Sequence, residues 1–188
     1  MIYFENELKL IKDEDVRNWT MEVLKHVNDK FYHEPASTTG KYHPSYALGE
    51  GGLYRHTVAA VKIANCIREN DSVFSMLNDE NYDYIIAALI LHDVCKCGKE
   101  WQYKHTRHAH PLYAAELIED VLGKNSDDAK RNYYVVTVKS LVASHMGQWN
   151  RCTWDKAVLP VPTSDEAKVV HLCDYLASRK FLEVNFEV

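Results

Sequence analysis

Apolar residues along most of the chain recur at helical spacing. Between residues 13 and 31 they fall three or four positions apart, and the same spacing continues over residues 55–70. Residues 84–95 are apolar nearly all round, a pattern typical of a helix buried at the centre of a domain. No stretch shows convincing alternation with a period of two between hairpin turns. The pattern therefore predicts an all-α fold, a single-domain helical bundle.

Capping residues predict the ends of the later helices. Pro111 suits the first turn of a helix that runs to Gly123. Ser126, followed by two aspartates, is expected to open a helix that reaches about His145. Thr163, with a glutamate three residues later, predicts a capping box at the start of the last long helix.

A long loop is expected over residues 33–52, which are rich in Gly, Pro, Ser and Thr. Loops of about twenty residues inside a compact domain are usually either functional or disordered. We expect this one to be functional because it leads directly to His56.

Length and composition fit one domain. A chain of 188 residues with 46% hydrophobic residues is a natural size for a single packed core. We divide it into three parts. Residues 1–44 hold an N-terminal helix and the long loop of the same domain, residues 45–182 form the main helical domain, and residues 183–188 form a C-terminal tail.

Several features indicate a cytoplasmic protein with no membrane partner. No segment approaches the ~18 uninterrupted apolar residues of a membrane span, and the first residues do not resemble a signal peptide. Five cysteines without framework spacing predict free thiols in a reducing compartment. A net charge of −5 argues against an extended nucleic-acid-binding surface but permits a small phosphate pocket. Oligomerisation stays open.

A histidine–aspartate doublet, His92-Asp93, closes the central apolar run. An imidazole nitrogen beside a carboxylate that can bridge suits a divalent cation. Helical bundles build core metal sites from such side chains on separate helices. For any one of these residues, ordinary packing or capping is the better interpretation, and only the set indicates a metal site. The other members of the set are His56, His110, His145 and Asp174.

The order of these residues resembles the HD-domain superfamily of metal-dependent phosphohydrolases. Five segments carry the resemblance: Gly51-Gly52-Leu53-Tyr54-Arg55-His56-Thr57, Leu91-His92-Asp93-Val94-Cys95-Lys96, His110-Pro111-Leu112-Tyr113-Ala114-Ala115, Ser144-His145-Met146-Gly147, and Val170 to Arg179 around Asp174. The resemblance covers roughly positions 45 to 182. It implies an HD-type helical bundle with a metal site in its core.

The resemblance also implies how the ligands divide. Asp93 would bridge two divalent ions, with His56, His92 and Asp174 on one ion and His110 and His145 on the other. Mn²⁺ is the expected metal, with Fe, Ni, Co, Mg or Zn as alternatives. The chain departs from the two-metal branches because Met146, a poor ligand for hard cations, follows His145 where those branches often have a second histidine. The second ion is therefore the less certain one.

His171 stands three residues before Asp174, so the two share a helix face. In the resembling family the aspartate is the ligand. We therefore expect His171 to pack near the ligands or to orient one of them, rather than to bind metal itself.

Lys96 discriminates between branches of the family. It lies four residues past His92, which would place it one turn along the same helix face. The resemblance implies that it faces the substrate phosphate and shares catalysis with Asp93, whereas a solvated surface lysine is the alternative. HD-type 5′-nucleotidases carry a glutamate at this position. A lysine is similar to the HD-GYP phosphodiesterases and the HD-domain 3′-end exoribonucleases.

Basic and aromatic residues suggest where a substrate binds. Residues 99–110 are locally basic and aromatic within an acidic protein, and rings with cations suit a base beside a phosphate. A second wall could follow His145, and the long loop offers weaker candidates. The candidate substrate-binding residues are Lys96, Lys104, His105, Arg107, Gln148, Trp149, Lys41 and His43.

These features predict a hydrolase that cleaves a phosphoester of a small nucleotide or a nucleic-acid 3′ end with metal-activated water. A phosphodiesterase or exonuclease-like activity is the leading version. The alternatives are a nucleotide phosphatase or dNTP triphosphohydrolase, and a non-catalytic metal-dependent nucleotide sensor. The intact ligand set argues against the sensor, which would be expected to have lost a ligand.

Overall fold

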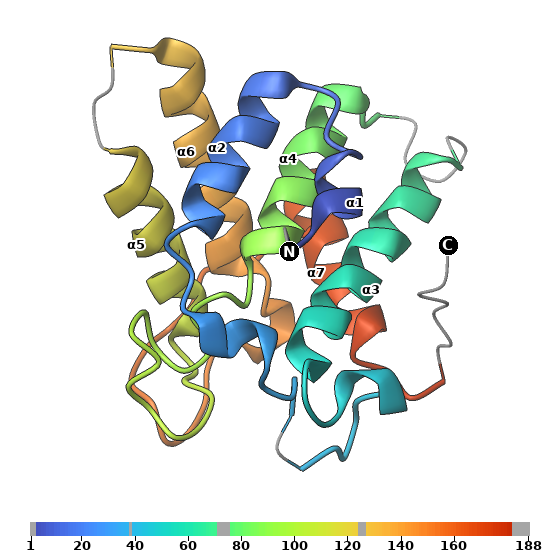
Figure 1. Cartoon of the computed structure of the whole chain (residues 1–188), viewed down its shortest axis with the longest axis vertical. Coiled ribbons are helices and arrows are strands. Elements are labelled where there is room, and N and C mark those ends of the chain that lie inside the picture. The colour runs from blue at the N-terminus through green and yellow to red at the C-terminus, as the bar shows by residue number, and fades with distance from the viewer. Residues whose placement is uncertain (1–2, 38, 71–75, 124–126, 182–188) are drawn as a thin grey trace.

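The fold is built from helices alone in the part of the chain that the computed structural model describes, residues 3–37, 39–70, 76–123 and 127–181. This confirms the predicted all-α class (Figure 1). In chain order the elements are α1 (Glu5–Leu8), α2 (Glu14–Leu24), the 3₁₀ helices η1 (Asp29–Tyr32) and η2 (Ser45–Ala47), α3 (Gly52–Arg68), α4 (Asp79–Leu91), α5 (His110–Leu122), α6 (Ala129–Ser144), the 3₁₀ helix η3 (Gly147–Trp149) and α7 (Asp165–Ala177).

Helix α4 lies at the centre of the bundle. Every residue from Tyr82 to Leu91 is buried, because the helix packs against α2, α3, α6 and α7. The prediction of a buried central helix is confirmed, but its bounds shift toward the N-terminus. Asn78 and Asn81 form a capping box that starts the helix at Asp79, and the helix ends at Leu91. The histidine–aspartate doublet therefore lies just past the helix end.

The predicted helix boundaries hold for α5 and need correction elsewhere. Helix α5 has Pro111 in its first turn and ends before Gly123, as predicted. The helix predicted over 13–31 ends at Leu24, and a separate 3₁₀ helix follows it. The last helix is capped by Ser164, whose hydroxyl accepts a hydrogen bond from the Ala167 N–H at 3.2 Å. The predicted capping box at Thr163 is therefore wrong by one residue.

Helix α6 is capped by Asp128, whose carboxylate accepts a hydrogen bond from the Arg131 N–H at 3.1 Å. The helix ends at Ser144, one residue before the predicted end. Ser126, the predicted opening residue, and the tail at 183–188 lie outside the described residues.

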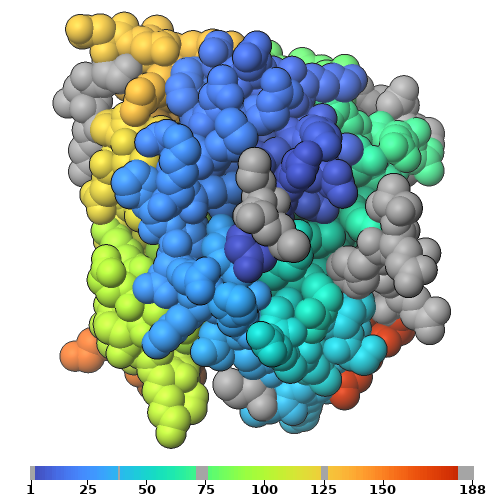
Figure 2. Space-filling model, viewed as in Figure 1, coloured from blue at the N-terminus to red at the C-terminus, as the bar shows by residue number. Residues whose placement is uncertain are grey.

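The N-terminal residues share the core of the main bundle. Phe4 and Phe31 are fully buried in the same hydrophobic cluster as α4. The carboxylate of Asp83 on α4 accepts hydrogen bonds from the backbone N–H groups of Lys12 and Asp13 at 3.0 and 2.7 Å. Figure 2 shows the N-terminal segment, in blue, covering the middle of one face of the molecule.

The long loop before α3 is held by one arginine. Arg55 donates hydrogen bonds to the backbone carbonyls of Tyr46, Leu48 and Glu50 at 2.6 to 3.0 Å. The Tyr46 hydroxyl then donates to the carbonyl of Ala177 on α7 at 2.8 Å. These bonds tie the described part of the loop to α3 and α7, beside the candidate site.

All five cysteines are free thiols, as predicted. Within the described ranges, no helix has the length and apolar character needed to cross a membrane.

Candidate metal centre

The structure brings the six predicted ligands together in the core. Five of them are buried, and the side chain of the sixth, Asp174, is 19% exposed. They come from the ends or inner faces of five helices: His56 on α3, His92 and Asp93 directly after α4, His110 at the start of α5, His145 directly after α6 and Asp174 on α7.

A glycine pair sets the entry of the chain into α3 and so the position of His56. Gly51 has a positive φ of 70°, which favours glycine. Gly52 lies so close to the carbonyl of Ala47 that any side chain there would collide with it. The backbone of the loop can therefore pass directly over the first turn of α3, one turn before His56.

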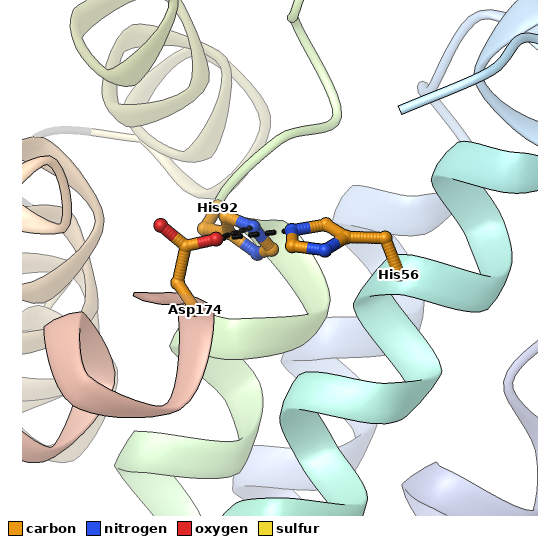
Figure 3. Close-up of side chains that lie close together, drawn as sticks. All are labelled: His56, His92 and Asp174. Carbon is orange, nitrogen blue, oxygen red and sulfur yellow. Dashed lines mark hydrogen bonds and ion pairs between the residues drawn. The ribbon is translucent and has the colours of Figure 1, made fainter. Parts of the chain in front are cut away.

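The first ligand group consists of His56, His92 and Asp174, which Figure 3 shows, together with one oxygen of Asp93. Nε2 of His56 lies 3.0 Å from Oδ1 of Asp174, and Nε2 of His92 lies 3.5 Å from the same oxygen. Oδ2 of Asp93 lies 3.9 and 3.5 Å from the same two nitrogens. The ligand atoms of His56, His92 and Asp174 all lie within 4.8 Å of one another, and Oδ2 of Asp93 lies beside the two histidine nitrogens.

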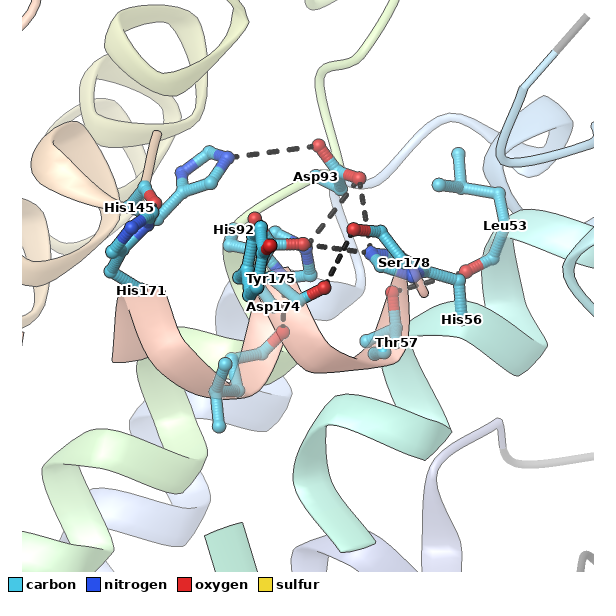
Figure 4. Close-up of polar contacts among 12 residues, drawn as sticks. Leu53, His56, Thr57, His92, Asp93, His145, His171, Asp174, Tyr175 and Ser178 are labelled. Atoms are coloured by element: carbon cyan, nitrogen blue, oxygen red, sulfur yellow. Dashed lines mark hydrogen bonds and ion pairs between the residues drawn. The ribbon is translucent and has the colours of Figure 1, made fainter. Parts of the chain in front are cut away.

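The second ligand group consists of His110, His145 and the other oxygen of Asp93. Oδ1 of Asp93 lies 2.9 Å from Nε2 of His110 and 4.0 Å from Nε2 of His145. The two imidazole nitrogens are 3.2 Å apart. Figure 4 shows Asp93 between His145 on one side and the first group on the other. The two oxygens of one carboxylate therefore face two different groups of ligands.

Three of the four histidines are oriented by the same kind of hydrogen bond to the backbone. Nδ1 of each lies 2.6 or 2.7 Å from the carbonyl three residues earlier in the chain. Because a carbonyl can only accept, Nδ1 donates, and in the neutral ring the lone pair of Nε2 then faces the centre. The pairs are His92 with Leu89, His110 with Arg107 and His145 with Val142.

Unpaired polar atoms at the centre fit divalent cations. Nε2 of His92 and Oδ1 of Asp93 are buried and make no hydrogen bond; the short His110–Asp93 contact lacks hydrogen-bond alignment. When both rings are neutral, Nε2 of His110 and Nε2 of His145 point lone pairs at each other, because both rings donate through Nδ1. Such an arrangement is costly without a positive charge between the atoms. Neutral imidazoles with carboxylates are the donors that divalent transition metals prefer.

The electrostatics of the centre favour a cation. Burial tends to raise the pKa of Asp93, but Lys96, His92 and His110 outweigh it and hold that pKa well below its usual range. The pKa of Asp174 is lowered in the same way, by His56 and His92 against burial. Burial lowers the pKa of His92, yet the two carboxylates outweigh it and raise the value to about 10. A divalent ion that binds here would therefore release the His92 proton.

The pKa of His145 is shifted in the opposite direction to that of His92. Burial and the neighbouring His92 lower its pKa to about 3, so its imidazole is neutral and its nitrogen is available as a ligand. His43, on the long loop, is also neutral because burial and His56 lower its pKa to about 4.

The metal centre forms the floor of a pocket of about 300 Å³. Three of the predicted substrate-binding residues line this pocket: His43, Lys96 and Trp149. Sequence reasoning did not assign a role to Tyr175 or Arg179, which also line it. Tyr175 follows Asp174 directly on α7, and Arg179 lies two residues past the end of that helix. Their closeness in sequence to a predicted ligand was the available signal.

The other predicted substrate-binding residues do not line the pocket. Backbone hydrogen bonds from Arg107 to Lys96 and from Tyr103 to Cys97, at 2.9 and 3.1 Å, fold the basic segment back on itself beside the pocket. Of the predicted substrate-binding residues, those outside the pocket are Lys104, His105 and Arg107, which line a separate surface hollow, together with the exposed Gln148 and Lys41.

Lys96 is not on the helix that carries the doublet, contrary to prediction, because α4 ends at Leu91. It lies on the following turn, where its N–H bonds to the carbonyl of Asp93. Its ammonium lies 2.5 Å from Oδ2 of Asp93, and the whole side chain is 12% exposed. The lysine thus contacts one candidate ligand and lines the same pocket.

His171 lies outside both ligand groups. Its Nδ1 donates to the backbone carbonyl of His145 at 2.7 Å. Its ring fills the space beside Gly147, where any side chain would collide with it. This contact ties the chain around His145 to α7. A role for His171 in orienting His145 stays a prediction.

Comparisons with known proteins identify one family. The family described as HD domain matches residues 53–179, more than half of the chain. A curated relative is the Dihydroneopterin 2',3'-cyclic phosphate phosphodiesterase of Methanocaldococcus jannaschii, which is 30% identical over 180 residues. The match covers 90% of this chain and 65% of the relative, so the chain spans less than two thirds of that protein's length. No solved structure matches significantly.

Proposed function

The chain belongs to the HD domain family, and we propose that it hydrolyses a small phosphodiester with two divalent cations bound at its buried centre. The observation that carries this proposal is the placement of Asp93. Its two carboxylate oxygens face the two separate ligand groups, which is the arrangement a carboxylate needs to bridge two ions. A single-ion protein would not need His110 and His145 on the far side of Asp93.

The side chains would divide the work as follows. Bound divalent cations would supply Lewis acidity and lower the pKa of a water so that hydroxide is available near neutral pH. Asp93 would contribute one oxygen to each ion. The histidines that are hydrogen-bonded to backbone carbonyls keep their Nε2 lone pairs directed at the centre. Lys96 places a positive charge beside Asp93, on the pocket side. There it can neutralise charge that develops on the phosphate oxygens.

The size of the pocket supports a small substrate. A volume of about 300 Å³ lies at the lower end of small-molecule sites, so a nucleic acid could enter only with its end. The relative from Methanocaldococcus jannaschii is named for a cyclic phosphodiester of a small molecule. We therefore place a small cyclic phosphodiester first among substrates, ahead of a nucleic-acid 3′ end.

A hydrolysis screen tests the proposal. The purified protein, supplemented with Mn²⁺ or Fe²⁺, would be incubated with a nucleoside 2′,3′-cyclic phosphate, short RNA, a nucleoside monophosphate and a dNTP. We expect the cyclic diester to be hydrolysed fastest and a chelator to stop the reaction. Binding without turnover of any of these would contradict the proposal and favour a nucleotide sensor. Turnover of the monophosphate or the dNTP alone would favour a phosphatase.

A further inference from the structure

One wall of the pocket is formed by two stacked rings and a guanidinium. The rings of Trp149 and Tyr175 are nearly parallel, 18° apart, with centroids separated by 5.6 Å. The guanidinium carbon of Arg179 lies 4.4 Å from the Tyr175 ring centroid and 6.0 Å from that of Trp149. All three side chains line the same pocket as the metal centre. We call these three residues the aromatic wall.

The aromatic wall is held in place from behind. Trp149 closes η3, with its N–H bonded to the carbonyl of Met146 at 3.1 Å, and its ring meets His171 edge to face. The guanidinium of Arg179 donates to the Ser178 hydroxyl through Nη2 and Nε at 2.8 and 3.1 Å. The orientation of the wall is therefore set before any substrate arrives, which lowers the entropic cost of binding.

Packing alone does not account for this wall. Trp149 is 41% exposed, although a ring of this size gains most when it is buried. Within the described residues, no carboxylate forms an ion pair with Arg179, whereas Arg107 in the neighbouring loop is paired with Asp155 at 3.4 Å. An exposed ring beside an unneutralised guanidinium suits a flat, electron-rich heterocycle, since rings stack on bases and arginine adds a cation–π contribution.

We propose that the aromatic wall binds the heterocycle of the substrate, with Trp149 as the stacking partner and Arg179 beside it. The substrate class would then be a cyclic phosphodiester that carries a flat heterocyclic base. The phosphate would lie over the metal centre while the heterocycle lies against the wall. This inference rests on the proposed function, because the phosphate end is assigned by the metal centre.

Two cyclic diesters that differ in the heterocycle test the proposal. Guanosine 2′,3′-cyclic phosphate carries a purine, whereas glycerol 1,2-cyclic phosphate has the same five-membered cyclic phosphate but no base. Loss of one aromatic stacking partner weakens base binding by roughly five- to a hundredfold. We expect Trp149→Ala to raise KM for the guanosine ester by roughly tenfold and to leave the glycerol ester unchanged. Trp149→Phe, which keeps a smaller ring, should show an intermediate KM.

Trp154 offers a matched control. It is another exposed tryptophan, 61% exposed, and it lines the separate surface hollow instead of the metal-centre pocket. Trp154→Ala should therefore leave KM for both esters unchanged. A Trp149→Ala variant that slows both esters equally would overturn the proposal, because the ring would then only support the site.

The inference and the proposed function can fail separately. If wild type hydrolyses neither ester, the proposed function is wrong, and binding then decides the inference. Calorimetric titration with guanosine 2′-monophosphate and with glycerol phosphate would be compared in wild type and Trp149→Ala. A roughly tenfold loss of affinity for the nucleotide alone would support the aromatic wall as a heterocycle site. Equal affinities in the two proteins would overturn it.

Discussion

The two ligand groups of the metal centre use the same residue types but differ in charge. The first group has a carboxylate of its own, Asp174, together with Oδ2 of Asp93. The second group, with His110 and His145, has only the shared Asp93 for negative charge. Because cation affinity depends on the charge of the ligands, the first ion should bind more tightly. The second ion should be the first to be lost.

The histidines of the second group are held in a fixed orientation more firmly than those of the first. Both histidines of the second group are fixed by hydrogen bonds to backbone carbonyls, whereas Nδ1 of His56 in the first group is buried without a partner. The second group is thus well oriented but poor in charge, and the first is rich in charge but less constrained. Asp93 belongs to both groups, so the comparison predicts that its loss has the largest effect of any substitution.

Asp93→Ala should abolish hydrolysis, by more than roughly 10³-fold, because both ions lose the ligand that they share. Metal content should fall for both groups in elemental analysis. The helical circular dichroism should stay largely intact, which separates loss of the site from loss of the fold. Activity within a few-fold of wild type would show that Asp93 does not bridge, and the assignment of the two groups would be wrong.

The cluster of candidate ligands could be predicted from the sequence because its members come from local motifs, whereas their binding of metal stays a prediction. The nearly continuous apolar run of α4 marks the centre of the bundle, and the doublet at its end is buried for the same reason. His110 begins a helix whose start Pro111 marks, and His145 directly follows the end of another helix. Such features can be predicted from the sequence because each depends on residues within a single helix or at its end.

The substrate side of the pocket was harder to predict because it depends on how loops turn. The backbone hydrogen bond from Arg107 to Lys96 folds the basic segment away from the pocket, and the spacing of residues in the sequence does not predict this bond. The end of α2 was missed for a related reason. Val27 and Phe31 continue the apolar spacing past Leu24, and side chains of a 3₁₀ turn reach the core at nearly the same spacing.

His110→Ala and His145→Ala sharpen the comparison between the two groups. Each should lower the metal content by about one ion per chain and leave the first group occupied. Hydrolysis should fall by roughly 10²- to 10³-fold, since one source of charge stabilisation is lost. Elemental analysis of the variants against wild type provides the measurement.

His108 is a suitable control for these two substitutions. It is a buried histidine two residues before His110, and it belongs to neither ligand group. His108→Ala should keep the wild-type metal content. If His110→Ala and His145→Ala also kept it, the protein would bind a single ion, and a nucleotidase-like reaction would replace the proposed one.

Lys96 should have the smallest effect of the three, because it contributes charge without binding metal. Lys96→Ala should lower kcat by roughly 10²-fold, comparable to the loss of one electrostatic donor. Metal content should stay at the wild-type level, since an ammonium has no lone pair to donate. Lys96→Arg retains the positive charge and should recover part of the rate.

The ammonium of Lys96 lies 2.5 Å from Asp93, so a fall in the metal content of Lys96→Ala would instead mean that the lysine acts by positioning that carboxylate. Full activity of Lys96→Ala on every substrate would remove the lysine from the mechanism, and with it the main sequence argument for a diester over a monoester.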